Sequence, residues 1–557
     1  MRLILGFLIA VWTLAAADTT WWKNAVIYEI YPRSFADTNG DGIGDLNGIT
    51  QHLDYLESLG VDAIWITPFY PSPQVDFGYD ISDYQAIDPQ YGTMADFDRL
   101  VAEAAKHHIR IIDDLVLNHT SDKHAWFTES RSSRTNPKAD WYMWNDGKPN
   151  RQPPNNWLSL FGHSAWQWDT PRNQFYYHEF YKEQPDLNWR NRQVRDAVYD
   201  MVRFWMKKGV AGFRLDAITT LFEDPQLRDE PTLAAVNAFG DKQVNRQYTD
   251  NLPEVHDVLR QLRGVTNEMP GRVLIGETYL PNVAELAKMY GKNNDELQLP
   301  MDTQLGFLNK LSATAFRAKL QDAETKLNGE IPLFVFSNHD NPRGWNRYGD
   351  GKHDEAIAKL IATLLLTPRC TAMMYYGEEL GMSNNNPTSV KQVKDPIGIV
   401  GWPKEIGRDG ERTPMQWNAD TNAGFSTSRE PWLPVAPNYR TRNVQTESKD
   451  PQSMLNYYKT LIRLRKQNEA IRNGDFVMLD EKNPSVLSYL RKQGGMVVLV
   501  ALNCTADPQT VHFDLGSQGV KGSNLKTLAS SFQPQGSANT SSLTLPAFGA
   551  YVGEVGQ

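Results

Sequence analysis

Ile109-Arg-Ile-Ile-Asp-Asp-Leu-Val-Leu-Asn-His119 is the stretch that most directly indicates the fold of this chain. The apolar run Ile109–Val116 is typical of a buried parallel strand, because helices cover both faces of a parallel sheet. A helical pattern precedes it at Met94–His107, and another lies further along at Arg195–Lys208. A strand set between helices predicts an α/β arrangement with a parallel sheet.

The same pattern recurs in both directions along the chain. Seven further strands are predicted at Val26–Tyr31, Val61–Ile66, Gly212–Ile218, Val273–Glu277, Leu297–Met301, Leu333–Phe336 and Ala372–Tyr376. Helical patterns lie between many of them, for example at Ile49–Leu59 and Asp354–Leu366. Eight strands interleaved with helices predict a (β/α)8 TIM barrel.

Two long segments interrupt the alternation. Ser121–Lys182 follows the third strand and Ser383–Glu447 follows the eighth, and loops of such length are uncommon unless they are functional. After Leu479 short alternating strands with Gly and Ser turns indicate an all-β sandwich. The predicted organisation is a barrel at 18–120 and 186–479, which includes the long loop insertion 383–447, an inserted domain at 121–185 and a C-terminal β-sandwich domain at 480–557.

The N-terminus has the pattern of an export signal. Arg2 precedes the mostly apolar run Leu3–Leu14, and Ala15-Ala16-Ala17 offers small residues for cleavage. A run of about 12 apolar residues is too short to span a bilayer of ~30 Å, and the alternative is a buried N-terminal helix. We expect residues 1–17 to be a signal peptide, no membrane span, and a mature protein that is secreted or periplasmic.

Charge and cysteine content exclude several classes of function. The 557 residues carry 57 Lys+Arg against 66 Asp+Glu, a net charge of −9, which argues against nucleic acid as a partner. Cys370 and Cys504 are the only cysteines, too few for a disulfide framework or an all-thiolate zinc site. The sequence leaves open whether they are bonded, which oligomer forms, and whether Asn503 and Asn539 carry glycans.

Polar side chains gather at the predicted strand ends. The third strand leads into Asp114 and His119, the fourth carries Arg214 and Asp216, the fifth ends in Glu277, and the seventh leads into His339 and Asp340. Each has a structural alternative, such as a helix cap or an ion-pair partner. Because loops at the strand ends of a barrel converge over one axis, their joint placement predicts an active site built on three carboxyl groups.

At these residues the chain resembles the α-amylase superfamily of glycoside hydrolases, family 13, in its α-glucosidase and oligo-1,6-glucosidase branch. The motifs are Asp114-Leu-Val-Leu-Asn-His119, Gln184-Pro-Asp-Leu-Asn188, Gly212-Phe-Arg-Leu-Asp216, Glu277 after Ile-Gly, and Phe336-Ser-Asn-His-Asp340. The resemblance covers nearly the whole mature chain. It implies a barrel domain A, an inserted domain B and a C-terminal β domain.

The resemblance implies a role for each site residue. Asp216 is the nucleophile, Glu277 the general acid/base, and Asp340 the third carboxylate. Retaining hydrolysis needs one ionised and one protonated carboxyl group about 5–5.5 Å apart. An adjacent cation such as Arg214 favours the ionised form, and crowding by carboxylates favours the protonated one. The implied substrate-binding residues are Asp76, Tyr79, His119, Phe161, Gln184, Arg214, His339 and Arg412.

Two elements bear on specificity in the resembling branch. Tyr79 is expected to stack under the bound glucose, while Asp76 is expected to pair with Arg412 of Glu411-Arg-Thr-Pro-Met-Gln-Trp417 and to close the pocket. A closed pocket admits one terminal sugar. The residue after the nucleophile is associated with linkage, Val with α-1,6 and smaller Ala or Thr with α-1,4; here it is Ala217.

Asp37-Thr-Asn-Gly-Asp-Gly-Ile-Gly-Asp45 places oxygen ligands at every second residue, as in an EF-hand loop, although Gly48 stands where the bidentate Glu would be. We expect a structural Ca2+ ion, or less favourably Mg2+. Its ligands would be Asp37, Asn39, Asp41, the Ile43 carbonyl and Asp45. The alternative is an Asx-rich turn without a metal. Acetal hydrolysis by two carboxyl groups needs no organic cofactor.

The sequence therefore predicts an exo-acting, retaining α-glucosidase that releases glucose from maltose and short oligosaccharides, and from sucrose. A first alternative is a transglycosylating enzyme, such as a sucrose isomerase or a trehalose-forming enzyme, in which a sugar replaces water. A second is a non-catalytic binding protein on the same scaffold. The presence of all three acids argues against that second alternative.

Overall fold

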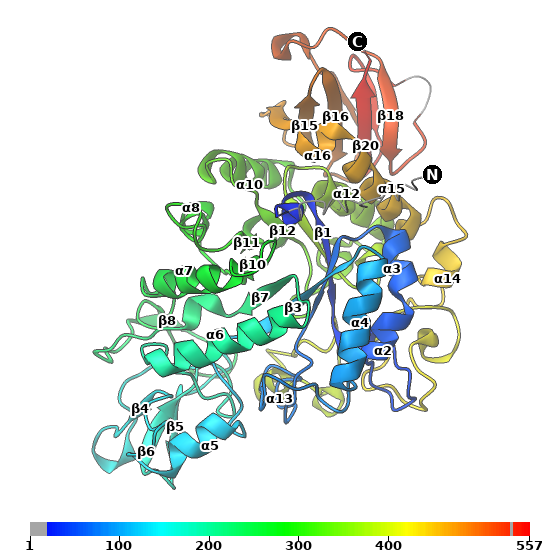
Figure 1. Ribbon diagram of the computed structural model, residues 1–557. Helices are drawn as coiled ribbons and strands as arrows, with labels where there is room; N and C mark the ends of the chain where they lie inside the picture. The colour runs from blue at the N-terminus through cyan, green and yellow to red at the C-terminus, as the bar shows by residue number, and fades with distance from the viewer. Residues whose placement is uncertain (1–18, 535–537, 557) are drawn as a thin grey trace, which may run out of the picture.

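The computed structural model describes residues 19–534 and 538–556, so the predicted signal peptide 1–17 lies outside the described residues. Eight parallel strands form a closed barrel in the order β1-β13-β12-β11-β10-β7-β3-β2 (Figure 1). They are β1 (Val26–Ile30), β2 (Ala63–Ile66), β3 (Arg110–Val116), β7 (Gly212–Asp216), β10 (Val273–Gly276), β11 (Leu299–Asp302), β12 (Leu333–Val335) and β13 (Thr371–Tyr375). The predicted (β/α)8 barrel is confirmed.

Helices surround the barrel on its outside (Figure 1). They include α2 (Leu46–Gln51), α3 (Leu53–Leu59), α4 (Met94–Lys106), α6 (Arg192–Lys207), α7 (Val255–Thr266), α8 (Val283–Lys288), α10 (Ala313–Lys326), α12 (Asp354–Leu366) and α15 (Met454–Gln467). Most of them start at a residue whose side chain caps the helix, although α3, α7 and α12 do not. At α4 the Thr93 side chain accepts from Asp96 N while the Asp96 side chain accepts from Thr93 N, which satisfies two otherwise unpaired N–H groups.

Alternation along the strands divides the core into two layers. One layer fills the barrel interior and includes Ile27, Trp65, Ile112 and Ile275. The other packs between strands and helices. Because the interior is filled by side chains, the chemistry of the barrel is confined to its rim.

An inserted segment follows β3. It contains α5 (Ala125–Ser132) and a three-stranded antiparallel sheet of β4 (Trp144–Asn145), β6 (Gln174–Tyr177) and β5 (Trp166–Asp169). Aromatic residues form its small core, among them Trp157, Trp166 and Tyr177. This segment lies at the far end of the molecule from the C-terminal strands (Figure 1).

The connection after β7 contains a hairpin that the sequence analysis does not predict. Its strands are β8 (Thr232–Val236) and β9 (Lys242–Val244), and every residue of β8 is exposed. The long segment after β13 is largely irregular, with the helices α13 (Pro396–Gly401) and α14 (Val444–Glu447). Both connections leave the end of the barrel where the predicted site residues lie.

The C-terminal part is all-β, as predicted. A five-stranded sheet has the order β14-β15-β16-β20-β18, and β17 pairs with β19. The strands are β14 (Asp475–Leu479), β15 (Val486–Gln493), β16 (Met496–Asn503), β17 (Gln509–Val511), β18 (Leu525–Ser530), β19 (Leu543–Leu545) and β20 (Ala550–Val555). One core joins both sheets. No helix among the described residues is long and apolar enough to cross a membrane.

Candidate active site

Arg214 occupies the centre of the candidate site. Side chains alternate along a strand, so Arg214 and Asp216 of β7 point to the same side. The guanidinium is fully buried; its Nη1 lies 2.7 Å from Asp216 Oδ1 and its Nη2 lies 2.8 Å from Glu277 Oε1. Nη1 also lies 3.1 Å from Asp114 Oδ1. One cation therefore holds three carboxyl groups from three neighbouring strands.

Glu277 directly follows β10, and its N–H donates to Leu215 O at 3.0 Å. Its Oε2 accepts a hydrogen bond of 2.8 Å from Ala217 N. Both Glu277 and Asp216 line one cavity of about 470 Å³ at the barrel rim. The two predicted catalytic carboxyl groups are thus neighbours that face the same space.

Burial is the main influence on the ionisation of this pair. It raises the pKa of Glu277 to about 7, against the opposing effect of Arg214. It likewise raises the pKa of Asp216, again against Arg214. The sequence-based expectation that Arg214 keeps Asp216 fully ionised is therefore incomplete, because desolvation outweighs the ion pair. Both carboxyl groups therefore hold their protons to a higher pH than free carboxyl groups do.

Asp340 differs from this pair, because three cationic or polar groups contact it. Its Oδ1 accepts from Arg408 Nη1 at 2.8 Å and from Arg412 Nη2 at 2.9 Å, and its Oδ2 lies 3.1 Å from His339 Nε2. Burial alone would raise the pKa of Asp340, but these neighbours outweigh it and lower the pKa below its ordinary value. Asp340 is accordingly ionised.

The histidines are neutral and their rings are fixed. Burial lowers the pKa of His119 to about 4 and that of His339 well below its ordinary value. His339 Nδ1 lies 2.7 Å from Glu29 Oε1 on β1, and its ring stacks on Tyr79 at 5.2 Å. Tyr79 donates to Asp114 Oδ2 at 2.9 Å. Both histidines and Tyr79 line the cavity.

The ion pair that closes one end of the cavity is not the predicted one. Arg408 Nη2 lies 2.8 Å from Asp76 Oδ1, and Arg408 also binds Asp340 and Asp395. Arg412 instead donates to His339 O at 2.7 Å and to Asp340. The prediction that Asp76 pairs with Arg412 is therefore wrong. The two arginines are four residues apart on one loop, and the loop conformation decides which of them reaches Asp76.

The other predicted substrate contacts fall into two groups. Phe161 lines the cavity, where the Arg408 guanidinium lies 5.4 Å from its ring centroid. Gln184, Arg214 and Arg412 are buried behind the cavity wall rather than part of its lining. Gln184 Nε2 donates to Asp76 Oδ2 at 3.2 Å and lies 3.1 Å from His119 Nε2. Gln184 therefore orients its neighbours.

Several lining residues were not predicted. They are Leu160, Phe180, Thr219, Thr220, Arg246, Asp250, Tyr279, Ile397, Glu405 and Arg408. Most come from irregular connections, where the sequence offers no periodicity to place a side chain. Two unpredicted residues had a signal: Glu29 is an acid inside an apolar strand, and Arg408 lies in Gly-Arg-Asp-Gly beside the motif that holds Arg412.

The predicted cation loop forms successive Asx turns. The side-chain oxygens of Asp37, Asn39 and Asp41 each accept from the N–H two residues further on, at 2.8–3.0 Å. The loop therefore carries side-chain oxygens at alternate positions, and oxygen is the ligand type that a hard cation prefers. Asp45 has a further role as the N-cap of α2, because its Oδ1 accepts from Gly48 N.

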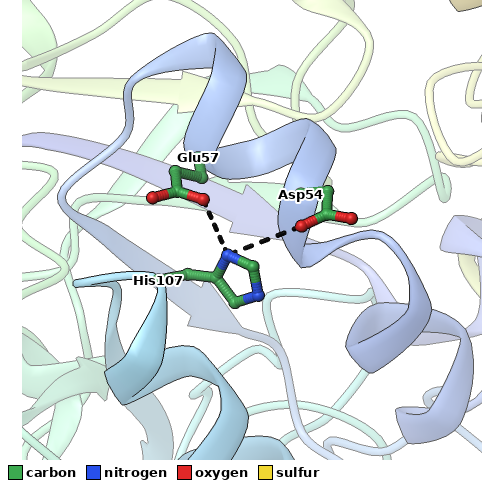
Figure 2. A group of neighbouring side chains, drawn as sticks. All are labelled: Asp54, Glu57 and His107. Carbon is green, nitrogen blue, oxygen red and sulfur yellow. Dashed lines mark hydrogen bonds and ion pairs between the residues drawn. The ribbon is translucent and has the colours of Figure 1, made fainter.

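A different group of possible metal ligands lies near α3 and α4 (Figure 2). His107 Nδ1 lies 2.8 Å from Glu57 Oε2 and 3.7 Å from Asp54 Oδ1. Asp54 and Glu57 are exposed, and His107 is the C-cap of α4. The group is separate from the cavity and was not predicted. We read it as a surface ion-pair cluster.

Comparison with known proteins agrees with this architecture. Residues 29–474 match the "Alpha amylase, catalytic domain" family and residues 476–552 the "Maltogenic Amylase, C-terminal domain" family. The barrel, its carboxyl groups and this match define the class: the chain belongs to the alpha-amylase family of glycoside hydrolases.

Individual relatives are similar over most of their length. A "Probable alpha-glucosidase" of Rhizobium meliloti (strain 1021) is 43% identical, covering 89% of this chain and 92% of that protein. An "Oligo-1,6-glucosidase" of Parageobacillus thermoglucosidasius is 40% identical, covering 87% and 91%. The crystal structure of the "alpha-glucosyl transfer enzyme, XgtA" is 40% identical with a TM-score of 0.88, covering 96% and 99%.

Proposed function

We propose that this chain is an exo-acting, retaining α-glucosidase that releases the terminal non-reducing glucose of maltose, short oligosaccharides and sucrose. The observation that carries the proposal is the placement of Asp216 and Glu277 on the two terminal nitrogens of one buried guanidinium, inside one cavity. A retaining glycosidase needs two neighbouring carboxyl groups, one ionised and one protonated.

In the first step Asp216 attacks the anomeric carbon of the terminal glucose. The bond from that carbon to the leaving oxygen breaks, and Glu277 gives its proton to this oxygen, which leaves a glucosyl ester on Asp216. In the second step Glu277, now a carboxylate, takes a proton from water. The water oxygen attacks the same carbon and releases Asp216, so the anomeric configuration is retained.

The ionised Asp340 and the neutral histidines suit the remaining parts of the reaction. Asp340 faces the developing positive charge on the ring and accepts hydrogen bonds from sugar hydroxyls. His119 and His339 can each both donate and accept in their neutral form. Tyr79 offers a ring face to the apolar face of glucose. The ion pair between Asp76 and Arg408 closes the far end, so that one terminal sugar fits.

Ala217 supports a preference for α-1,4 linkages, because it follows the nucleophile and lines the cavity. We further propose that Asp37, Asn39, Asp41, the Ile43 carbonyl and Asp45 hold a structural Ca2+ ion. The apolar run and the three alanines before Asp18 support export of the mature protein. The ion would stabilise the loop and take no part in hydrolysis.

The similarity to a glucosyl transfer enzyme favours a second candidate, in which a sugar or another alcohol intercepts the glucosyl ester. It uses the same first step and the same residues. The two candidates differ in their products from sucrose: hydrolysis gives free glucose and fructose, whereas transfer gives an isomerised disaccharide.

The test combines products with two substitutions. NMR should show α-glucose as the first anomer that the wild-type enzyme releases from maltose. The same assay with isomaltose, sucrose and maltotriose reports which linkages are cut and from which end. Asp216→Asn should abolish hydrolysis of an aryl α-glucoside, and Glu277→Gln should retain the first step only for good leaving groups. An active Asp216→Asn variant, or β-glucose as the first product, would refute the assignment.

A further inference from the structure

Glu29 is a fully buried acid behind the cavity, on β1, and no step of the proposed reaction uses it. Its Oε1 lies 2.7 Å from His339 Nδ1 and accepts from His339 N at 3.2 Å. In the described part of the chain its Oε2 is buried without a hydrogen-bond partner, and His339 is the only residue paired with this carboxyl group. The carboxyl group of Glu29 therefore serves one histidine.

Aromatic side chains enclose the His339 ring. The centroid of the Tyr79 ring lies 5.2 Å from it and that of Tyr31 5.8 Å, both stacked, and Trp65 meets it edge-on at 5.9 Å. An imidazolium would lose its hydration among these rings. Burial accordingly lowers the pKa of His339 well below its ordinary value, against the opposing effect of Asp340. His339 is thus neutral and has one proton for its two ring nitrogens.

Asp340 determines which nitrogen carries that proton. Its Oδ2 lies 3.1 Å from His339 Nε2, and it is ionised because Arg408 and Arg412 both donate to its Oδ1. An unprotonated Nε2 would direct its lone pair at a carboxylate oxygen, which is repulsive. The proton is therefore on Nε2, and Nδ1 carries a lone pair.

The lone pair on Nδ1 requires a hydrogen-bond donor, and Glu29 Oε1 is the atom that lies beside it, at 2.7 Å. A carboxylate would have no proton to donate. A neutral carboxylic acid donates from its hydroxyl, and the same oxygen can still accept from His339 N. Burial raises the pKa of Glu29 well above its ordinary value, against the opposing effect of Arg214. The negative charges of Asp340 and Asp114 raise this pKa further.

We propose that Glu29 is a positioning residue of the active site: as a neutral acid it donates to His339 Nδ1, so that the Nε2 proton is directed to Asp340 and to the hydroxyls of the bound sugar. The inference rests on the proposed glucosidase function and concerns the same site. A neutral His339 leaves the charge of Asp340 available to the sugar ring, where positive charge develops. An imidazolium would oppose that charge.

Two substitutions of Glu29 separate the loss of a donor from the loss of a charge. Glu29→Gln retains a neutral donor of the same length, so kcat/KM for an aryl α-glucoside should stay within about threefold of the wild type. Both limbs of its pH profile should also stay in place. Glu29→Met fills a similar volume without a donor, which leaves Nδ1 unpaired, and kcat/KM should fall at least about tenfold.

Asp113→Asn is the matched control for Glu29→Gln. Asp113 is likewise a fully buried acid of a barrel strand, β3. Because side chains alternate along a strand, it lies on the opposite side of β3 from Asp114 and hence from Arg214. The control should retain wild-type kinetics and an unchanged pH profile.

Nitrogen NMR on the full chain with isotope-labelled histidine reads the ring of His339 directly. The variant His339→Gln identifies the two signals of this residue by their loss. In the wild type and in Glu29→Gln we expect a protonated Nε2 and an unprotonated Nδ1. In Glu29→Met we expect the signal of Nδ1 to move, because that nitrogen loses its hydrogen bond or gains the proton.

The outcomes keep the two proposals apart. A wild type that hydrolyses neither maltose nor an aryl α-glucoside would refute the glucosidase function, while NMR would still report the His339 tautomer. Two protonated nitrogens on His339, or a proton on Nδ1 in the wild type, would overturn the role of Glu29.

Kinetics can overturn the role of Glu29 as well. A Glu29→Gln variant that is as slow as Glu29→Met, or whose pH profile is shifted, would show that a charge rather than a donor had been lost. A Glu29→Met variant with wild-type kcat/KM would show that His339 needs no donor. Melting temperatures of all variants show whether they fold, and Glu29→Gln with the NMR signals tests the proposal even if Glu29→Met does not.

Discussion

Arg408 and Asp76 are 332 residues apart in the chain, yet their side chains meet at 2.8 Å across the closed end of the cavity. The same guanidinium binds Asp340 at 2.8 Å and Asp395 at 2.7 Å. Asp395 is fully buried, so Arg408 is anchored from behind while it faces the substrate. This end of the cavity is therefore formed where the loop after the last barrel strand, which carries Arg408, meets the connection after β2, which carries Asp76.

Arg408→Ala should open this end. Removing one partner of a buried ion pair leaves Asp76 with an uncompensated charge and typically costs about 2–5 kcal/mol. We expect kcat/KM for an aryl α-glucoside to fall at least about thirtyfold. We also expect an aryl α-maltoside to give maltose and the aryl alcohol among the first products, measured by chromatography, whereas an enzyme with a closed pocket first gives glucose and the aryl α-glucoside.

Arg440→Ala is the matched control for Arg408→Ala, because Arg440 lies on the same long loop and is exposed. It should retain wild-type kinetics. An Arg408→Ala variant that still gives glucose and the aryl α-glucoside as the only first products, at the wild-type rate, would show that Arg408 does not close the pocket.

The activity should depend on pH through the pair of Asp216 and Glu277. Burial raises the pKa of both groups. Below the first macroscopic pKa both are protonated and the nucleophile is lost. Above the second both are ionised and no acid remains. We expect a bell-shaped profile of kcat/KM with its maximum near neutral pH, and loss of the alkaline limb in Glu277→Gln with a good leaving group.

Glu277 should also limit stability at high pH. Its pKa in the folded state, about 7, is above the ordinary value of 4.5. The folded state therefore binds this proton more tightly than the unfolded state does. The free energy of unfolding has its full value below about pH 4.5, decreases as the pH rises through 7, and has lost the whole contribution of this proton above that range. At about 1.4 kcal/mol per unit this is roughly 3 kcal/mol. Glu277→Gln should raise the melting temperature at pH 8.

The comparison at pH 4.5 is the internal control for that prediction. There Glu277 is neutral in the folded state, and Gln is a neutral isostere, so the variant and the wild type should melt at similar temperatures. An equal gain at both pH values would point to packing rather than to ionisation.

Removal of the proposed cation should destabilise the fold without a direct effect on the chemistry. Chelation, or Asp41→Ala, should lower the melting temperature because three Asx turns would hold oxygen dipoles together with no ion between them. Thermal melts with chelator and with added Ca2+ or Mg2+ measure this. Asp54→Ala removes a carboxylate from the surface cluster of Figure 2 and is the control. A melting temperature that chelation leaves unchanged would exclude the ion.

Ala217 should influence both linkage and stability. Its backbone is left-handed, with φ 45° and ψ 40°, a conformation that a β-branched residue adopts only with strain. Ala217→Val should lower the melting temperature and move the ratio of isomaltose to maltose hydrolysis upward, within the ~1–3 kcal/mol that a methyl-scale change gives. Ala217→Thr has the same branching, so it should share the strain and retain the preference for maltose.

The barrel could be predicted because each of its strands is a local pattern. Arg110–Val116 and Thr371–Tyr375 are short apolar runs between helical segments, and a buried parallel strand needs nothing else to be recognised. Asp216, Glu277 and Asp340 could be placed together for a similar reason, because Asp216 ends β7, Glu277 directly follows β10 and Asp340 lies on the connection that begins after β12. The hairpin of β8 and β9 gave no such signal, since its strands are short and exposed.

The sequence by itself determined the barrel, the C-terminal β domain and the carboxyl groups at the rim, because periodicity and strand ends are properties of neighbouring residues. Only the tertiary structure decided that Arg408 rather than Arg412 pairs with Asp76, and that desolvation outweighs Arg214 at Asp216. The first depends on the conformation of a long connection, and the second on how much water is left around a charge. Those quantities arise only when segments distant in the chain are packed against each other.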